Sequence, residues 1–279
     1  MPPNLPWSVS VKGSAWRNGW VASTRDLPEE AAVALTYNRV THAVMMATPA
    51  DLHDFAVGFS LSEGVIGQPS DIEDFEIVPV EGGLELRMWI ASPLMAALET
   101  RRRRLAGATG CGMCGLESLA EALRPVPHVD TGRAFSPSDI MAAACSIAPA
   151  QILGRATRAV HAAGFWRPQG GLWALREDVG RHTALDKVFG ALAVAGISAA
   201  TGVVVLTSRI SIELVQKAAR MGACVVVGVS APTALAVRAA DGAGMTLVGV
   251  AREDGFEVFC GGERLEKEGQ GSALDPLGP

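Results

Sequence analysis

The sequence lacks both a surplus of positive charge and any long apolar run. Its 29 acidic residues outnumber its 24 basic ones, so the formal net charge is -5. This balance disfavours a general nucleic-acid-binding protein, which clusters cations against phosphates. No stretch approaches the roughly 18 apolar residues of a membrane span, and residues 1–7 lack the basic segment and apolar core of a secretion signal. We expect a cytoplasmic protein with no membrane and no nucleic acid among its partners.

Closely spaced cysteines are also scarce. The chain has five cysteines, an odd number, and only Cys111 and Cys114 lie close together, which argues against a disulfide framework. Cys145, Cys224 and Cys260 occur in apolar segments. We expect these three to be buried as small hydrophobic residues.

The first half of the chain, 1–130, predicts a small α+β domain. Two pairs of β-rich runs flank short polar turns and predict two hairpins. The expected strands are 32–37 with 40–47 and 75–80 with 84–90. Between the hairpins, Thr48 is the expected N-cap of a helix with Pro49 in its first turn, and Gly64 ends that helix.

The second half, 131–266, predicts an α/β domain that begins with a helix capped by Ser138 and Asp139. Further on, apolar strands alternate with helices in the order β-α-β-α-β, as expected for a parallel sheet with right-handed crossovers. The expected strands are 203–207, 223–229 and 246–251, and the expected helices are 210–221 and 232–243. The tail 267–279 is rich in Gly, Ser and Pro and is expected to be disordered.

Polar residues follow the three expected strands of this sheet. Ser208 and Arg209 follow the first, Ser230 follows the second, and Arg252 and Asp254 follow the third. Ligands of parallel sheets bind beyond the carboxyl ends of the strands, and helix N-termini at such ends can hold phosphate. The three ends therefore predict an anion site, although any one of these residues alone also fits an ordinary helix cap.

The stretch 109–115 holds three glycines around Cys111 and Cys114, so we expect a mobile loop in which the sulfurs can be reached. A helix expected at 116–123 would lower the pKa of a thiol at its N-terminus, and a thiolate can attack a persulfide. A structural zinc site is disfavoured because no second ligand pair occurs. A thioredoxin-like redox pair stays open, but the preceding arginines 101–104 do not read as the strand it needs. Two interpretations of those arginines are equally good. They are the solvated C-terminal end of a helix, or they attract an anionic cofactor or an acidic partner to the loop.

A second polar stretch, 176–182, separates an apolar strand from an amphipathic helix and favours a site over a plain surface. His182 lies four residues before Asp186, a spacing at which the carboxylate can orient the imidazole. His161 fits a buried core histidine as well as it fits a residue of the site. Zinc deaminase chemistry is rejected because the expected His-x-Glu and Pro-Cys-x-x-Cys signature is absent.

Taken together, these stretches resemble the FdhD family of formate dehydrogenase accessory sulfurtransferases, in the family's order over about residues 30–265. The matching stretches are 46–52, 58–59, 63–64, 110–115, 176–182, 184–187, 213–217, 230–233 and 247–249. One departure is that Thr157, Arg158 and Ala159 stand where the family commonly has Thr-Gly-Gly.

The resemblance implies a homodimer with a cytidine-deaminase-like C-terminal domain. It implies a sulfurtransferase that receives sulfur from a cysteine desulfurase as a persulfide on Cys111, with Cys114 as the partner residue. The acceptor would be the bis-molybdopterin guanine dinucleotide cofactor destined for formate dehydrogenase, and no metal would be ligated by the protein itself. The family's cofactor-binding stretch matches Val250, Ala251, Arg252, Glu253, Asp254 and Gly255.

We expect a second set of residues to position the nucleotide or its pyrophosphate, through bidentate Arg contacts and helix N-termini. This set is Arg181, His182, Ser208, Arg209 and Ser230. Two other functions stay open. One is a non-catalytic chaperone that binds the molybdenum cofactor and docks on formate dehydrogenase, which needs neither cysteine. The other is a dithiol redox protein, which needs both.

Overall fold

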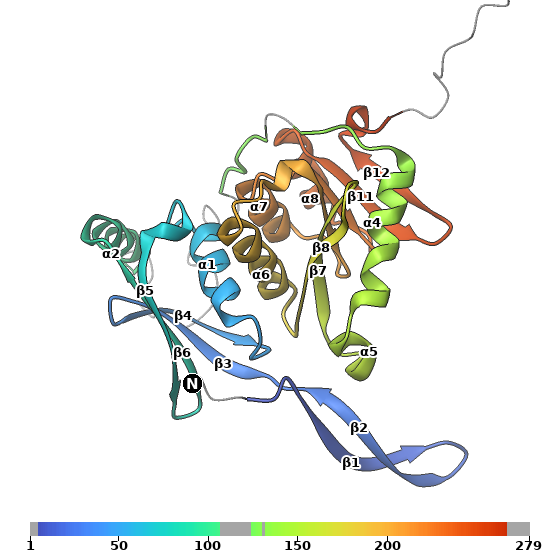
Figure 1. Cartoon of the computed structure of the whole chain (residues 1–279), viewed down its shortest axis with the longest axis horizontal. Helices are drawn as coiled ribbons and strands as arrows, with labels where there is room; N and C mark the ends of the chain where they lie inside the picture. Colours follow the sequence, from blue (N-terminus) through green and yellow to red (C-terminus); the bar gives the residue numbers. More distant parts are fainter. Residues whose placement is uncertain (1–4, 107–123, 130–131, 267–279) are drawn as a thin grey trace, which may run out of the picture.

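The structure is a computed structural model that describes residues 5–106, 124–129 and 132–266. Within these residues the strands form three assemblies: a two-stranded arm, a four-stranded sheet and a six-stranded sheet (Figure 1). Cys111, Cys114, the helix expected at 116–123 and the tail 267–279 lie outside the described residues.

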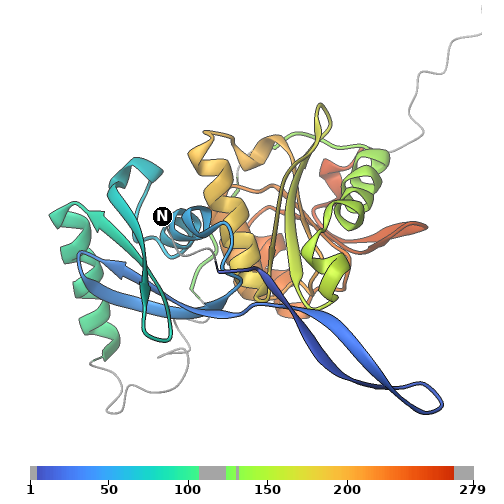
Figure 2. The same cartoon turned by 60° about the horizontal axis from the view of Figure 1, so that its bottom comes forward.

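The arm is an antiparallel hairpin of β1 (Ser8–Trp16) and β2 (Trp20–Pro28), which the sequence analysis missed. Its turn contains Asn18 and Gly19, with a positive φ at both, and the Asn-Gly pair was the signal that could have revealed it. The rings of Trp16 and Trp20 meet edge to face at 5.5 Å beside this turn. Both views show the arm projecting away from the rest of the chain (Figures 1 and 2).

The four-stranded sheet confirms the two predicted hairpins. Its strands are β3 (Ala31–Tyr37), β4 (Val40–Ala47), β5 (Ile72–Val80) and β6 (Gly83–Ile90), in the order β4-β3-β6-β5. β3 and β6 pair in parallel, so the sheet is mixed. Helices α1 (Leu52–Ser62) and α2 (Ser92–Ala106) bury their apolar side chains against one face of it, and a short helix η1 (Pro69–Asp71) precedes β5.

The predicted N-cap of α1 is wrong. Thr48 is fully buried and accepts a hydrogen bond from the amide of Val179 at 3.2 Å. The N-cap is Asp51, which adopts a left-handed conformation and forms no side-chain cap. The predicted stop is confirmed, because Glu63 is the C-cap and Gly64 follows it with a φ of 69°. A contact with the distant Val179 thus outweighs the local capping pattern.

The six-stranded sheet confirms the predicted β-α-β-α-β order. Its strands are β7 (His161–Arg167), β8 (Gly171–Asp178), β9 (Val203–Leu206), β10 (Val225–Gly228), β11 (Thr246–Arg252) and β12 (Gly255–Cys260). The spatial order is β12-β11-β10-β9-β7-β8, with β9, β10 and β11 parallel and the other pairings antiparallel.

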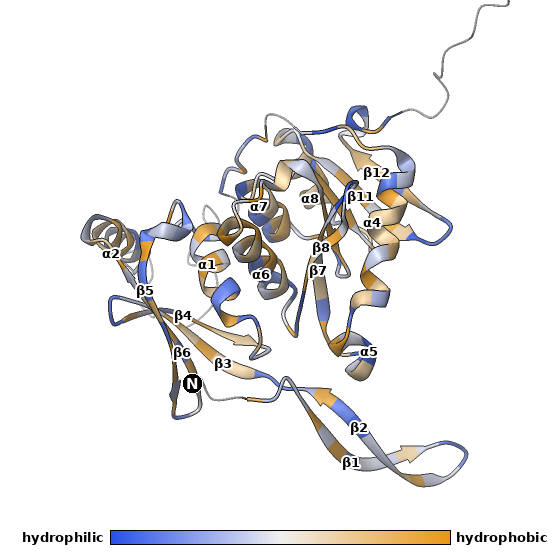
Figure 3. Ribbon diagram, in the orientation of Figure 1, coloured by the Kyte–Doolittle hydropathy of each residue, from blue (hydrophilic) through white to orange (hydrophobic). Residues whose placement is uncertain are grey.

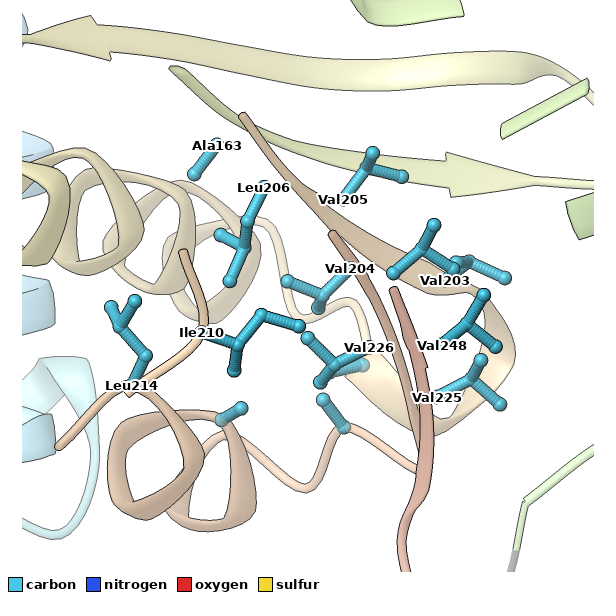
Figure 4. Packing of buried hydrophobic residues seen from close by; sticks show 14 of the residues in the cluster. Ala163, Val203, Val204, Val205, Leu206, Ile210, Leu214, Val225, Val226 and Val248 are labelled. Atoms are coloured by element: carbon cyan, nitrogen blue, oxygen red, sulfur yellow. The ribbon is translucent and has the colours of Figure 1, made fainter. Parts of the chain in front are cut away.

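Helices cover both faces of this sheet. Helix α4 (Pro137–Ala150) lies on one face, and α6 (Arg181–Val194), α7 (Ile212–Arg220) and α8 (Ala234–Gly242) lie on the other (Figures 1 and 2). Between them the valines of β9, β10 and β11 form a core with Ile210 and Leu214 (Figure 4). The shorter helices are α5 (Leu153–Thr157), η2 (Ala199–Thr201) and η3 (Gly262–Arg264).

Two predictions about α4 are wrong. Its N-cap is Ser136 rather than Ser138, because Ser136 and Asp139 form a reciprocal capping box. Cys145 is exposed, whereas Cys224 is buried as expected and Cys260 is half-buried. The buried face of α4 carries Ile140, Ala143, Ala144 and Ile147, and this helical period places Cys145 outside the core.

Helices α1 and α6 join the two larger sheets by packing directly against each other (Figure 1). Gly58 of α1 and Gly190 of α6 permit the close approach. A Cβ atom on Gly58 would clash with the carbonyl oxygen of Asp186, and one on Gly190 would clash with that of Asp54. The division of the chain at 130 stays a prediction, while the side chain of Val129 packs in the core of the six-stranded sheet.

Candidate functional site

The predicted strand ends share one edge of the six-stranded sheet. The sheet register pairs His161 with Asp178. The registers of β7 with β9, β9 with β10 and β10 with β11, continued two or three residues beyond their last pairs, give one row. The row is Asp178, His161, Ser208, Ser230 and Ala251. Because neighbouring strands lie about 4.8 Å apart, the row spans roughly 19 Å, which suits an elongated ligand better than a small ion.

Two helices begin beside this row without a side-chain cap. Gly180, which has no side chain, is the N-cap of α6, and Ser211 is the N-cap of α7 but does not cap the first turn with its hydroxyl. The first residues of α6 are Arg181 and His182, and among the described residues no group bonds to the buried Nε of Arg181 or Nε2 of His182. The uncapped start of α6, together with these nitrogens, forms a local arrangement suited to an anion.

The histidines at this edge are held neutral. Burial, followed by the nearby Arg181 guanidinium, lowers the pKa of His182 to about 4, and the same two causes lower the pKa of His161. An anionic ligand would offset the charge of Arg181 and favour protonation of both imidazoles.

The predicted orientation of His182 by Asp186 is wrong. Asp186 is fully buried, and its Oδ1 accepts hydrogen bonds from Ser62 at 2.7 Å and from Lys217 at 2.9 Å. The carboxylate therefore points into the junction of α1, α6 and α7 and is not available to the imidazole. A buried carboxylate takes the partner that compensates its charge most fully, and here that partner is Lys217.

In the polar stretch 176–182, some side chains are bonded within the fold and others could bind a ligand. Arg176 donates to Asp54 of α1 at 2.8 Å, and Asp178 accepts from the fully buried Lys187 at 2.6 Å. Glu177 accepts from the first three amides of the turn that begins α5, those of Ile152, Leu153 and Gly154. Only Arg181 and His182, at the end of the stretch, keep polar nitrogens without a partner among the described residues.

A cavity of about 590 Å³ lies between α4 and the ends of β10 and β11. Residues 251–254, from the stretch that the family resemblance assigned to cofactor binding, line it. The exposed Cys145 of α4 lines it as well. Its lining is Ala144, Cys145, Ala148, Pro149, Val229, Ala251, Arg252, Glu253 and Asp254. The sequence analysis missed Cys145, although the helical period of α4 carried the signal.

The backbone at the mouth of this cavity departs from regular β structure. Val250 has a φ of 52°, and the pairing of β11 with β12 shifts between Gly249 and Arg252. The amide of Val250 donates to the carbonyl oxygen of Ser230 at 3.4 Å. A β-branched residue in the left-handed region is uncommon, and irregularities of this kind re-aim side chains next to binding sites.

The predicted binding residues therefore fall into two groups along one edge. Arg181 and His182 lie at the start of α6, on the helical face opposite α4, whereas the stretch 250–254 lies by the cavity on the α4 side. Ser208 and Ser230 lie between the groups in the row. Ser208 donates to the carbonyl oxygen of its neighbour Arg209, whose side chain is exposed.

Residues 5–106, 124–129 and 132–266 hold no group of three or more His, Cys, Asp or Glu side chains arranged to bind a metal ion. The same residues include no helix with the length and apolar character needed to cross a membrane.

Fold and edge together define a mixed α/β protein whose strand ends are suited to an anionic ligand. Residues 28–266 match the model of the FdhD/NarQ family, and the chain belongs to that family.

Similar proteins include the sulfur carrier protein FdhD of Agrobacterium fabrum, which is 49% identical over 257 residues covering 91% of this chain and 95% of the relative. The protein of the same name from Cupriavidus necator is 48% identical, covering 91% of this chain and 89% of its own length. The fold also matches a crystal structure of a proposed formate dehydrogenase accessory protein from Desulfotalea psychrophila. That match has a TM-score of 0.73 and 24% identity, covers 94% of this chain and 100% of the other, and supports the fold alone.

Proposed function

We propose that this protein is a cytoplasmic sulfur carrier that serves formate dehydrogenase. It takes sulfur from a cysteine desulfurase as a persulfide on Cys111 and passes it to the bis-molybdopterin guanine dinucleotide cofactor. The relatives named sulfur carrier protein FdhD support the carrier role. The structural observation that carries the proposal is the row of strand ends beside two uncapped helix starts.

The anion-suited edge would hold the nucleotide part of the cofactor. Arg181 and His182 offer, at the start of α6, nitrogens that lack a partner among the described residues, and a phosphate group would satisfy them together with amides of the first turn. Arg252, at the cavity, is suited to a second anionic group because its guanidinium is permanently charged. Two cationic positions on one edge fit a ligand that carries charge at more than one point.

The sulfur step would be a thiol exchange. The Cys111 thiolate attacks the terminal sulfur of the desulfurase persulfide, the sulfur–sulfur bond to the donor cysteine breaks, and the donor leaves as a thiolate. The terminal sulfur keeps its proton, so Cys111 ends as a persulfide and no external oxidant or reductant is needed. The reducing conditions of the cytoplasm keep the acceptor thiol available for this exchange.

A second function has specific support, because the described residues by themselves supply both the anion-suited edge and the cavity. A chaperone that only binds the cofactor would use the same edge and dispense with both cysteines. The dithiol alternative would instead form a reversible disulfide between these two residues and depend on both.

Mass spectrometry after incubation with a cysteine desulfurase and cysteine tests the proposal. We expect one added sulfur that maps to Cys111, disappears in Cys111→Ala, and persists in the control Cys145→Ala, which removes an exposed thiol outside the Cys-x-x-Cys motif. Sulfur on Cys145 alone, or on no cysteine, would reject the carrier assignment in favour of the chaperone. A loss of two hydrogens linked to a peptide joining Cys111 and Cys114 would favour the dithiol protein.

Ligand binding can be followed separately through Cys145, whose thiol lines the cavity. We expect guanosine diphosphate, used as the probe, to slow alkylation of Cys145 in the wild type and in Cys111→Ala. Protection should weaken in Arg252→Ala and in Arg181→Ala. Alkylation at an unchanged rate over all probe concentrations would remove the cavity from the proposed cofactor site.

A further inference from the structure

Glu63 is the first residue after α1, and its carboxylate contacts three cations. Its oxygens lie 3.5 Å from the ammonium nitrogen of Lys217, 3.5 Å from the guanidinium of Arg124 and 3.9 Å from the guanidinium of Arg101. The backbone carbonyl oxygen of Glu63 also accepts a hydrogen bond from Arg101 at 2.7 Å. One residue therefore contacts side chains from three separate parts of the chain.

Two of these cations flank the segment 107–123, in which Cys111 lies. Arg101 is near the end of α2, before the segment, and Arg124 is the first residue described after it. In the sequence, Arg101 is 38 residues from Glu63 and Arg124 is 61 residues from it. Both flanks are therefore brought to the end of α1 by the tertiary fold and not by local sequence.

Helix α7 adds a second contact to the later flank. Gln216 donates to the backbone carbonyl oxygen of Arg124 at 3.2 Å, and the next residue, Lys217, bonds to both Glu63 and Asp186. The side chains of Gln216 and Lys217 are buried. The side chain and the backbone of Arg124 are thus each bonded to a residue on or beside a packed helix.

The end of α1 is an unfavourable position for a carboxylate unless cations compensate it. Glu63 is the C-cap of α1, where the helix dipole disfavours negative charge. The helix itself is mostly apolar and has no basic residue in its last turn (Figure 3). Burial by itself would raise the pKa of the Glu63 carboxyl. The nearby Lys217, Arg124 and Arg101 together outweigh burial and hold that pKa below its ordinary value.

We propose that Glu63 is a positioning residue for sulfur transfer, because its carboxylate fixes both flanks of the segment 107–123 and so limits where Cys111 can act. Helix α1 lies between α2 and the helices α6 and α7, so one group at its end can contact both flanks (Figures 1 and 2). The inference rests on the proposed function, which makes Cys111 the sulfur carrier.

Chain geometry explains why the contacts of Glu63 matter to the thiol. Cys111 follows Ala106, the last residue of α2, by five residues, and five residues span at most about 18 Å. If α2 is released as far back as Arg101, ten residues separate Cys111 from that point, and the limit rises to about 36 Å. The effective concentration of a tethered group falls as its tether lengthens. Loss of the carboxylate should therefore slow reactions of Cys111 that need a defined position.

Hydrogen exchange measured by mass spectrometry tests the contacts directly. We expect Glu63→Gln, which keeps the size and removes the charge, to speed exchange at least about fivefold in peptides covering 101–106 and 124–129 but not in α4. Glu63→Asp keeps the charge and should recover part of the protection. The matched control is Glu85→Gln, because the Glu85 carboxylate is similarly exposed and pairs with Arg87 at 2.8 Å on the four-stranded sheet. Unchanged exchange at the two flanks would overturn the proposal.

A second variant keeps the test decisive if Glu63→Gln does not fold. Arg101→Gln removes one contact, from a side chain that is 34% exposed, and should leave the thermal midpoint close to that of the wild type. We expect faster exchange in 101–106 and unchanged exchange in 124–129. Equally faster exchange in both flanks and in α4 would show general loosening of the fold and would also overturn the proposal.

Sulfur loading gives the functional readout. Persulfide formation on Cys111 is followed at increasing concentrations of a cysteine desulfurase and is compared with alkylation of Cys111 by iodoacetamide, a small reagent that needs no defined position. We expect Glu63→Gln to lower the maximal loading rate about tenfold. The desulfurase concentration at half-maximal rate and the alkylation rate should each stay within about twofold of the wild type.

Equal loading rates in Glu63→Gln and the wild type, or a matching fall in alkylation, would overturn the positioning role. Glu63→Asp should load faster than Glu63→Gln, since it retains the charge that the three cations contact. A wild type that takes up no sulfur on Cys111 would instead reject the proposed function. Exchange at the flanks would still decide whether Glu63 fixes them, so the two failures are distinguishable.

Discussion

The ammonium nitrogen of Lys217 on α7 lies 2.9 Å from both carboxylate oxygens of Asp186 on α6. Ser62, the last residue of α1, completes the contact with bonds of 2.7 Å to Asp186 and 2.8 Å to Lys217. Burial raises the pKa of the Asp186 carboxyl, and Lys217 opposes that shift. Three helices from the two halves of the chain therefore meet at one buried ion pair.

Removing one partner of this pair should be strongly destabilising. We expect Lys217→Met to lower the free energy of unfolding by about 3 to 5 kcal/mol, because Asp186 would remain buried without a compensating charge. The double variant Lys217→Met with Asp186→Leu should recover part of the loss. Urea unfolding measures all three, with the exposed Lys12→Met as a control that should change by less than about 0.5 kcal/mol. A double variant no more stable than Lys217→Met would contradict this account.

Close packing of α1 on α6 should not tolerate a methyl group at its centre. We expect Gly58→Ala and Gly190→Ala each to lower stability by about 3 kcal/mol or more, since the added Cβ would overlap backbone atoms of the facing helix. Thermal unfolding measures the loss. Gly242→Ala at the end of α8 is the matched control, because nothing lies within 4 Å of its Cβ position. Equal effects at Gly58 and Gly242 would contradict the close approach.

Arg158 should be a site of local strain that glycine relieves. It ends α5 with a φ of 58°, in the left-handed region, and its side chain is exposed. We expect Arg158→Gly to raise stability by about 0.5 to 1 kcal/mol, because the backbone penalty exceeds the entropy that glycine loses on folding. Arg155→Gly, within the same short helix, should instead lower stability. Differential scanning calorimetry distinguishes the two, and a loss of stability in Arg158→Gly would show that no strain is present.

Stability should fall in mild acid through His182. Its pKa of about 4 in the folded chain lies below its ordinary value of 6.5. Between these values the unfolded chain binds a proton that the folded chain does not, so stability is present above pH 6.5 and is lost as the pH falls toward 4. We expect the wild type to lose about 2 kcal/mol more than His182→Asn between pH 7 and pH 5. Urea midpoints at the two pH values measure this, and parallel losses would show that another group titrates.

Local patterns predicted much of the fold. The two hairpins of the four-stranded sheet and the alternating strands and helices from 203 to 251 follow from turn residues and apolar runs that a short window contains. The arm was missed although Asn18 and Gly19 carry a hairpin signal, because Gly13 and the serines leave its alternation of apolar and polar residues weak.

The sequence by itself determined which residue types lie at the strand ends, because parallel strands bring those ends to one edge wherever the helices pack. Only the tertiary structure decided which polar groups are available there. Asp186 pairs with Lys217, 31 residues away, and not with His182 four residues away. Thr48 bonds to Val179 instead of capping its own helix. Burying an unpaired polar group costs so much free energy that each such group bonds to the partner that the packed core provides. That partner is often distant in the sequence, so local spacing does not predict it.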